Sequence, residues 1–345
     1  MLQIGTAFVN LRPKWWLISI VQVLSYLAFI FYFEYLLITT TIIFSEDLNS
    51  ANESAHFCVL GILMLIIIVN YPLKRRNFID LMRIVAKNYF QYNDGYKSDS
   101  VERWKKNTQK LKSRMLVLVT GYFIVVLTVK IFIAPLIDQY QGYDTDDYIK
   151  GVYMKLPIPL WLPYQIDGLA KKLATLGTEA IGGSMLISVI IGADLILIFQ
   201  SVDIILQMRI LRDSIKHLET RAMLLYNQWN GTTYNPDEGC KLRRGDPSFM
   251  KALNYCIKQN AQHHRIISRA FYNIYDLGSV PLAAAFLIGS AIIALSLFNF
   301  ATSKLRIGPQ IFSLMLLVAE VCNMALICFV GQELSDLVSI YTFII

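Results

Sequence analysis

Apolar residues in this chain gather into six blocks that polar segments separate. Each block has about 18 or more residues, the length that an α-helix needs to cross the hydrocarbon core of a bilayer. Lipid offers no partner for an exposed backbone amide, so such a block must satisfy its amides internally as a helix. The pattern predicts membrane-spanning helices at 16–44, 56–73, 115–137, 176–206, 277–301 and 310–330.

The polar segments 74–114 and 207–273 are themselves helical in pattern. After the fourth block, apolar residues recur at alternating steps of four and three, which is one face of a helix: Leu211, Ile215, Leu218, Ala222 and Leu225. No proline or glycine interrupts this stretch, so we expect one helix from about Leu176 to Leu225. Such extensions of the spans would either pack together in the cytoplasm or lie separately on the membrane surface.

Basic residues are divided unequally between the two sides of the predicted membrane. The N-terminal segment and the segments 74–114 and 207–273 carry 25 of the 32 Lys and Arg residues, and the segments on the other side carry six. Lys and Arg accumulate in cytoplasmic connections, so the N-terminus is expected in the cytoplasm. The first outer segment then contains Asn52 in an Asn-Glu-Ser glycosylation acceptor.

Composition agrees with a polytopic membrane protein, and the sequence shows no signature of an enzyme. The chain is 55% hydrophobic and 17% charged, with a mean hydropathy of +0.46. The net charge of +7 is accounted for by attraction to the anionic inner leaflet, so no nucleic acid is expected as a partner. No phosphate-binding loop, metalloprotease motif or nucleophile elbow occurs. Neighbouring His263 and His264 point in different directions on a helix, so we expect a helix surface there, with no metal and no cofactor.

Four ionisable residues inside the predicted spans carry functional hypotheses, because a charge in lipid is costly unless it is paired or hydrated. Lys130 is expected to pair with Glu34 or Glu179, or else to extend to the outer interface. Glu179 could also simply begin its helix. Asp194 and Glu320 lie deeper in their spans and are expected to face protein or water.

The outer halves of the second, third, fourth and sixth spans are rich in small, aromatic and methionine residues. Small residues permit close helix packing or leave a void, and Met and aromatic side chains line apolar pockets. Ordinary helix packing uses the same residue types. We predict a pocket for a small apolar ligand that is lined by Phe57, Gly61, Met64, Gly121, Tyr122, Val125, Gly182, Met185, Phe312 and Met315.

Four segments stand out by their order and their place relative to the spans. They are LPIPLWLPYQID in the long outer loop, QMRILRDSI after the fourth span, CIKQNAQHHRIISRAFYNIYDL before the fifth span and CFVGQELSD at the end of the sixth. In this order and on these sides of the membrane, they resemble the insect odorant receptors. The resemblance extends from about residue 56 to residue 336. The related gustatory receptors are the alternative family.

The resemblance implies an all-α, polytopic subunit of a ligand-gated cation channel, with residues 1–345 as a single membrane domain. It implies a small volatile odorant as ligand, a co-receptor (Orco) as partner in a heterotetramer, and the plasma membrane of a sensory neuron dendrite as location. Its cytoplasmic helices would pack into an anchor. Since the family's seventh span has no counterpart before Ile345, we expect a truncated form or a silent subunit that does not conduct. A secondary transporter would instead show paired halves, and a G-protein-coupled receptor would have its N-terminus outside.

Overall fold

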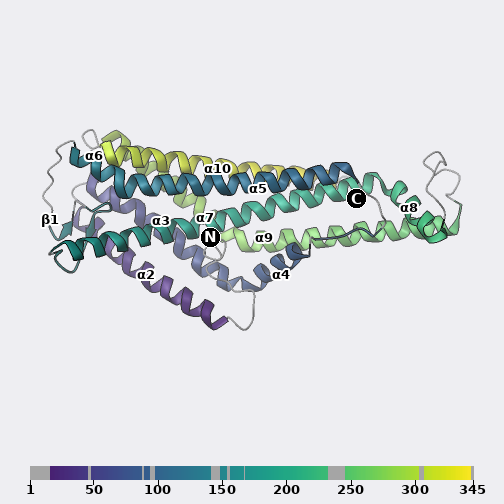
Figure 1. Ribbon diagram of the computed structural model, residues 1–345, viewed down its shortest axis with the longest axis horizontal. Helices are drawn as coiled ribbons and strands as arrows, with labels where there is room; N and C mark the ends of the chain where they lie inside the picture. The colour runs from purple at the N-terminus through teal and green to yellow at the C-terminus, as the bar shows by residue number, and fades with distance from the viewer. Residues whose placement is uncertain are drawn as a thin grey trace. The chain divides into compact units, whose positions relative to one another are not determined.

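The described part of the chain is almost entirely helical. The computed structural model describes residues 16–45, 48–87, 89–93, 98–140, 148–153, 156–166, 168–231, 245–302 and 307–342. The helices shown in Figure 1 are α2 (Trp16–Ile43), α3 (Leu48–Leu73), α4 (Arg75–Ala86), α5 (Asp99–Thr128), α6 (Ala134–Tyr140), α7 (Leu169–Lys216), α8 (Leu218–Asn230), α9 (Pro247–Thr302) and α10 (Ile307–Thr342). A π-helix, η2 (Val129–Ile133), joins α5 to α6.

A small antiparallel sheet lies between α6 and α7. Its strands follow the order β1 (Tyr148–Ile149), β2 (Val152–Tyr153) and β3 (Leu160–Trp161). Tyr148 pairs with Tyr153, and Val152 pairs with Trp161. The sheet belongs to the segment that the sequence placed in the long outer loop.

Six helices in the described part of the chain are long and apolar enough to cross a membrane. They are α2, α3, α5 with its continuation, α7, α9 and α10, and each covers all or nearly all of one of the six predicted blocks. The prediction of an all-α polytopic membrane protein is confirmed.

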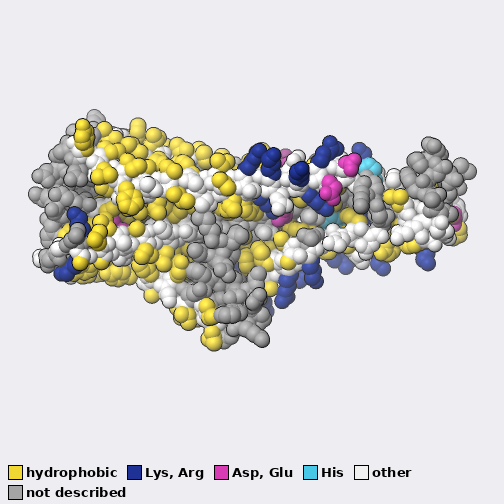
Figure 2. Space-filling view, in the orientation of Figure 1, with side chains coloured by type: hydrophobic (Ala, Val, Ile, Leu, Met, Phe, Trp, Pro, Cys, Tyr) yellow, Lys and Arg dark blue, Asp and Glu magenta, His cyan; other side chains and the backbone are white. Residues whose placement is uncertain are grey.

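The chain divides into two compact units. Unit 1 comprises Met1–Arg75, Met115–Leu197 and Leu277–Phe329, and unit 2 comprises Arg76–Arg114, Ile198–Asp276 and Val330–Ile345. Hydrophobic side chains cover much of the visible surface of unit 1, whereas Lys and Arg gather on unit 2 (Figure 2). Unit 1 therefore has the surface of a lipid-embedded bundle, and unit 2 that of a bundle in water.

Unit 2 has an apolar core that α8 and the first part of α9 share. Its buried members are Ala222, Met223, Leu225, Phe249, Ala252 and Cys256. Two of them, Ala222 and Leu225, belong to the apolar face that the sequence predicted. The helical segments of unit 2 therefore pack together, as one of the two alternatives expected.

The single helix expected from Leu176 to Leu225 is wrong, because the chain breaks at His217. That residue has φ −105° and ψ 27°, between the end of α7 and the start of α8. The guanidinium of Arg221 donates to the backbone carbonyl of Ser214, 3.3 Å away. In an unbroken helix this carbonyl would accept from the amide four residues later, so the side chain replaces a backbone bond at the break.

Arg221 is the centre of a buried polar cluster in unit 2. The side chain is 1% exposed and donates to Asn260 Oδ1 at 2.8 Å and to Gln259 Oε1 at 3.0 Å. Its guanidinium carbon also lies 4.1 Å from the centre of the Tyr92 ring. Hydrogen bonds and a cation–π contact thus compensate the burial of this charge.

His263 extends the same cluster, which corrects its expected position on the helix surface. The side chain is fully buried, and its ring stacks against that of Phe90 with 5.3 Å between centroids. The hydroxyl of Tyr92 donates to Nδ1 at 2.7 Å, and Nε2 donates to Gln207 Oε1 at 3.1 Å. A neutral imidazole with its proton on Nε2 satisfies both bonds. The imidazole of His263 therefore belongs to the interior of unit 2 and not to a helix surface.

In unit 1, polar side chains join α3 to α9. Asn70 Nδ2 donates to the Leu277 carbonyl at 2.8 Å, and Asn52 Nδ2 donates to the Leu295 carbonyl at 3.0 Å. His56 accepts from the Ser296 hydroxyl at 3.1 Å. Such bonds hold helices together where both sides of the contact are apolar.

Asn52 occupies a position that argues against a glycan. The residue is 4% exposed, and the Nδ2 atom to which a sugar would attach is the donor to Leu295. Glycosylation would have to break this bond and find space among packed helices.

Candidate functional site

A buried aromatic and aliphatic cluster lies at the end of unit 1 that carries the β-strands. We call it the strand-end cluster. Its buried members come from α2, α3, α5, α10 and the outer loop: Phe33, Leu36, Leu37, Phe57, Cys58, Val126, Leu156, Ile158, Leu160, Leu162, Phe312 and Leu316. Half-buried Phe29, Tyr122 and Met315 pack against them. Helices far apart in the sequence thus converge on one apolar region.

Two stacked rings form the middle of the strand-end cluster. Phe57 on α3 and Phe312 on α10 are nearly parallel, with 5.8 Å between their centroids. The Tyr122 hydroxyl on α5 donates to the Met315 carbonyl on α10 at 2.6 Å. These contacts join α3, α5 and α10 through side chains that have both apolar surface and defined orientation.

The ammonium of Lys130 lies over this pair of rings. Its Nζ is 4.8 Å from the centre of Phe312 and 5.8 Å from that of Phe57. Lys130 is 6% exposed and belongs to the π-helix η2, in which the amide of Ala134 bonds to the carbonyl of Val129. A π-helical turn inserts an extra residue and so changes the direction of neighbouring side chains.

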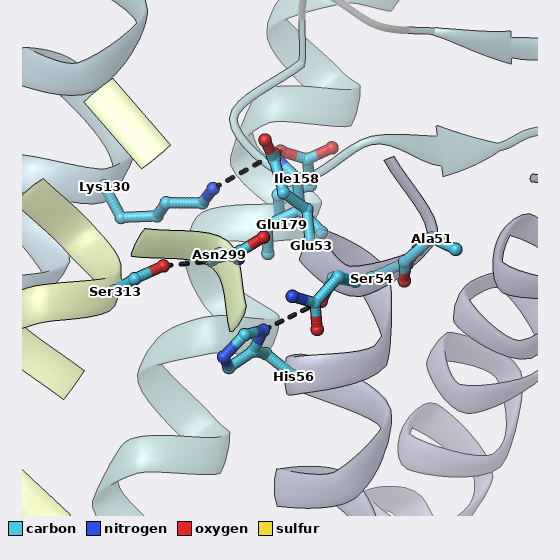
Figure 3. Close-up of polar contacts among 10 residues, drawn as sticks. Ala51, Glu53, Ser54, His56, Lys130, Ile158, Glu179, Asn299 and Ser313 are labelled. Carbon is cyan, nitrogen blue, oxygen red and sulfur yellow. Dashed lines mark hydrogen bonds and ion pairs between the residues drawn. The ribbon is translucent and has the colours of Figure 1, made fainter. Parts of the chain in front are cut away.

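Two carboxylates accompany Lys130 (Figure 3). Glu53 on α3 forms an ion pair with it, with 3.7 Å between Oε2 and Nζ. Glu179 on α7 is 3% exposed, and its Oε2 accepts from the amide of Ile158 in the outer loop at 3.4 Å. The other oxygen, Oε1, has no hydrogen-bond partner among the residues that the structure describes. The site therefore combines one cation, two carboxylates and aromatic faces in a buried position.

The outer loop closes the strand-end cluster. The amide of Trp161 in β3 donates to the hydroxyl of Thr40 on α2 at 2.7 Å, and the Trp161 ring meets Tyr35 edge to face at 6.2 Å. Ile158 is fixed by Glu179, as described above. A ligand that enters from this end must pass or displace the loop.

A small void adjoins the cluster between α2, α3 and α7. Its volume is about 10 Å³, close to that of a single water molecule. It is lined by Phe29, Ile30, Phe33, Glu34, Met64, Gly182, Met185 and Leu186. A ligand larger than a few atoms therefore needs movement of the flexible methionine and phenylalanine side chains.

The predicted pocket residues divide into three sets. Phe57, Tyr122, Phe312 and Met315 belong to the strand-end cluster. Met64, Gly182 and Met185 line the void, and Gly61 lies against the carboxylate of Glu34 beside it. Gly121 and Val125 lie on the exposed side of α5, with Val125 52% exposed.

Asp194 and Glu320, the two ionisable residues expected deeper in their spans, both contact other helices of unit 1. Asp194 on α7 accepts from Asn323 Nδ2 on α10 at 3.0 Å. Glu320 on α10 approaches Gly289 on α9, where an added Cβ would lie 3.2 Å from its Oε2. Both residues are half-buried and are separate from the strand-end cluster.

Sequence reasoning missed Glu53 and Thr40. Lys130 pairs with Glu53, not with Glu34, although Glu53 stands in the polar segment before the second predicted block. The structure begins α3 at Leu48, so this polar segment is helical and extends the span. The one signal for this pair in the sequence is that Glu53 and Lys130 are both expected near the outer surface of the membrane.

Comparisons with known proteins give one family and one fold. The sequence profile of a family described as 7tm Odorant receptor matches residues 47–339. The solved structure of the insect olfactory receptor OR5 from Machilis hrabei in complex with eugenol is similar, with a TM-score of 0.67 and 12% identity, over 94% of this chain and 73% of that one. A second structure of the same receptor has a TM-score of 0.65 and 11% identity, over 93% and 72%. No curated protein matches the sequence.

Proposed function

This chain belongs to the 7tm odorant receptor family, and from that premise we propose that it binds a small volatile apolar molecule at the strand-end cluster. It is a multi-pass membrane protein with a chemoreceptor role.

One observation carries the proposal. Residues from three separate helices, Phe57, Tyr122, Phe312 and Met315, contribute to one buried cluster under the outer loop. Apolar burial releases about 25 cal/mol per Å², so a ligand that buries about 200 Å² gains about 5 kcal/mol. Part of this is consumed by lost translational freedom, so we expect modest affinity.

Lys130 supplies the polar part of the proposed site. The Phe57–Phe312 pair presents its faces to the ammonium, and Glu53 balances the charge. A ligand oxygen could accept a hydrogen bond from Nζ while its carbon skeleton contacts the rings. The receptor from Machilis hrabei was solved with eugenol, which supports a small organic ligand for a chain of this fold.

The channel function is part of the proposal. The chain acts with a co-receptor (Orco) in a heterotetramer, and ligand binding in unit 1 gates a cation channel in the plasma membrane. The helical packing of unit 2 around Arg221 supports a role as the anchor through which subunits assemble.

The surfaces of the two units support the proposed orientation. Lys and Arg gather on unit 2, and exposed apolar side chains such as Phe31, Leu118 and Leu287 cover unit 1. This distribution supports unit 2 and the N-terminus in the cytoplasm. An epitope added at Met1 should bind antibody only after the cells are permeabilised.

The main test measures current in cells that express the chain with the co-receptor. A panel of volatiles should include at least one that evokes a cation current, and the variant Phe312→Ala should shift its concentration dependence to higher values. The variant Val125→Ala, on the exposed side of α5, is the matched control and should leave it unchanged. Equal shifts in both variants would contradict a site at the strand-end cluster. Binding without any current would retain the ligand site and remove the channel function.

A further inference from the structure

A buried carboxylate on α2 has no hydrogen-bond partner among the residues that the structure describes. Glu34 is 5% exposed, and both of its side-chain oxygens lie beyond hydrogen-bond distance of any donor in the described part of the chain. Lys130, which was expected to pair with Glu34 or Glu179, forms its ion pair with Glu53. A buried carboxyl group without a partner is costly, so this arrangement is explained if something outside the chain supplies the donor.

Gly61 on α3 leaves the space that the Glu34 carboxylate occupies. An added Cβ at Gly61 on α3 would lie 1.4 Å from Glu34 Oε1, so only glycine leaves room for the side chain where it lies. Glu34 also lines the void of about 10 Å³ between α2, α3 and α7. Since other residues of the same chain bury Glu34, assembly with a second subunit does not bring a donor to it.

The other walls of the void are aromatic and sulfur-containing. Phe29 and Phe33 on α2 stack with 6.2 Å between centroids, and Met64 and Met185 lie on α3 and α7. Glu34 is the sole ionisable side chain in the described lining. A carboxylate beside aromatic faces is a favourable environment for an organic cation.

We propose that this void binds the head group of a small protonated amine, with the ammonium donating to Glu34 and contacting the faces of Phe29 and Phe33. The inference rests on the proposed function and deepens it by naming a ligand class. The volume suits an ammonium head. The carbon skeleton of the amine extends along Phe29 and Met185, which are half-buried and border the void.

Other head groups fit less well. An ammonium has three donors and no acceptor, which matches a carboxylate that has acceptors only. An ester, aldehyde or carboxylic acid anion brings acceptors only, so it offers no donor to an ionised Glu34. An alcohol offers one donor and no charge. The site is therefore selective for amines over neutral molecules of the same skeleton.

The test compares two probes with one carbon skeleton, phenethylamine and phenethyl alcohol. Binding is measured on the purified full chain in lipid nanodiscs, for the wild type, Glu34→Gln and Glu320→Gln. In the wild type the amine should bind more tightly than the alcohol. Glu34→Gln should lose about ten- to hundredfold in amine affinity, the usual cost of a charge-assisted bond, and keep its alcohol affinity within about threefold. Glu320→Gln changes another carboxyl within a span and should alter neither.

The outcomes separate the inference from the proposed function. If the alcohol binds and the amine does not, or if Glu34→Gln leaves amine affinity unchanged, the amine site is wrong and the apolar site stands. If the amine alone binds and depends on Glu34, the amine site stands and the proposed neutral volatile is wrong. Should Glu34→Gln fail to fold, Gly61→Ala displaces the same carboxylate, and amine affinity must fall in that variant for the inference to survive.

Discussion

Replacement of Arg221 by methionine should destabilise unit 2 strongly. Methionine keeps much of the apolar volume but removes every donor. Arg221 donates to Asn260 Oδ1, to Gln259 Oε1 and to the Ser214 carbonyl at the helix break. Without it, Asn260 Oδ1 still accepts from the Ser214 hydroxyl, which leaves Gln259 Oε1 and the Ser214 carbonyl as the two acceptors that lose their donor. Each buried acceptor left without a donor costs about 1–3 kcal/mol. Loss of the desolvated cation–π contact with Tyr92 adds about 2 kcal/mol.

The expected loss is therefore about 4–8 kcal/mol in the free energy of unfolding. Thermal unfolding of the purified protein in detergent, followed by size-exclusion chromatography, should show a midpoint lower by about 5–15 °C. Arg212→Met is the matched control. Arg212 lies on the exposed face of α7, close to the same break, and its loss should move the midpoint by no more than about 1 °C.

Lysine at position 221 gives an intermediate case. It retains the charge but cannot reach Asn260 and Gln259 from one planar group, so it should recover only part of the lost stability. Equal midpoints for Arg221→Met and Arg212→Met would refute the reasoning, since they would mean that the cluster contributes nothing to the packing of unit 2.

Three further predictions concern unit 1. Gly61→Ala should lower the free energy of unfolding by about 1–3 kcal/mol, because the added Cβ overlaps the carboxylate of Glu34. The double variant with Glu34→Ala should regain most of this stability, as measured by thermal unfolding. The wild type and Asn52→Gln should migrate equally in electrophoresis, and glycosidase should change neither, since the Asn52 side chain is buried. A larger mass of the wild type would contradict the position of Asn52 in α3. Lys130→Met should weaken binding of oxygen-containing volatiles and spare hydrocarbons of equal size, as measured by titration of the purified chain; equal weakening of both classes would remove Lys130 from ligand recognition.

Most of the fold is predictable from the sequence because the strongest signal, a block of apolar residues, is local in the chain. A block of apolar residues must form a helix in lipid whatever surrounds it, so the six spans follow from local composition. At the break at His217, the Arg221 side chain takes the place of a backbone amide as the donor to the Ser214 carbonyl. The spacing of apolar residues gives no indication of such a side-chain bond. The burial of His263 was missed for a similar reason, because its partners Phe90 and Tyr92 come from a segment far away in the chain.

The candidate site was predictable in part. Depth and residue type placed Phe57, Phe312 and Met315 in the same layer, and the structure brings them together. The same criteria cannot assign the side of a helix, so Val125 was named although it lies on the exposed side of α5. The role of Gly61 depends on a carboxylate from another helix, and nothing in its own neighbourhood in the sequence indicates that contact.

The most direct test of the account is a structure of the full chain in nanodiscs, with its co-receptor and a volatile that has been shown to evoke current. The account predicts ligand density in contact with Phe57, Tyr122, Phe312 and Met315, with Lys130 directed at a polar atom of the ligand. Density for the ligand only among the helices of unit 2, or only on the lipid-facing side of α5, would contradict it.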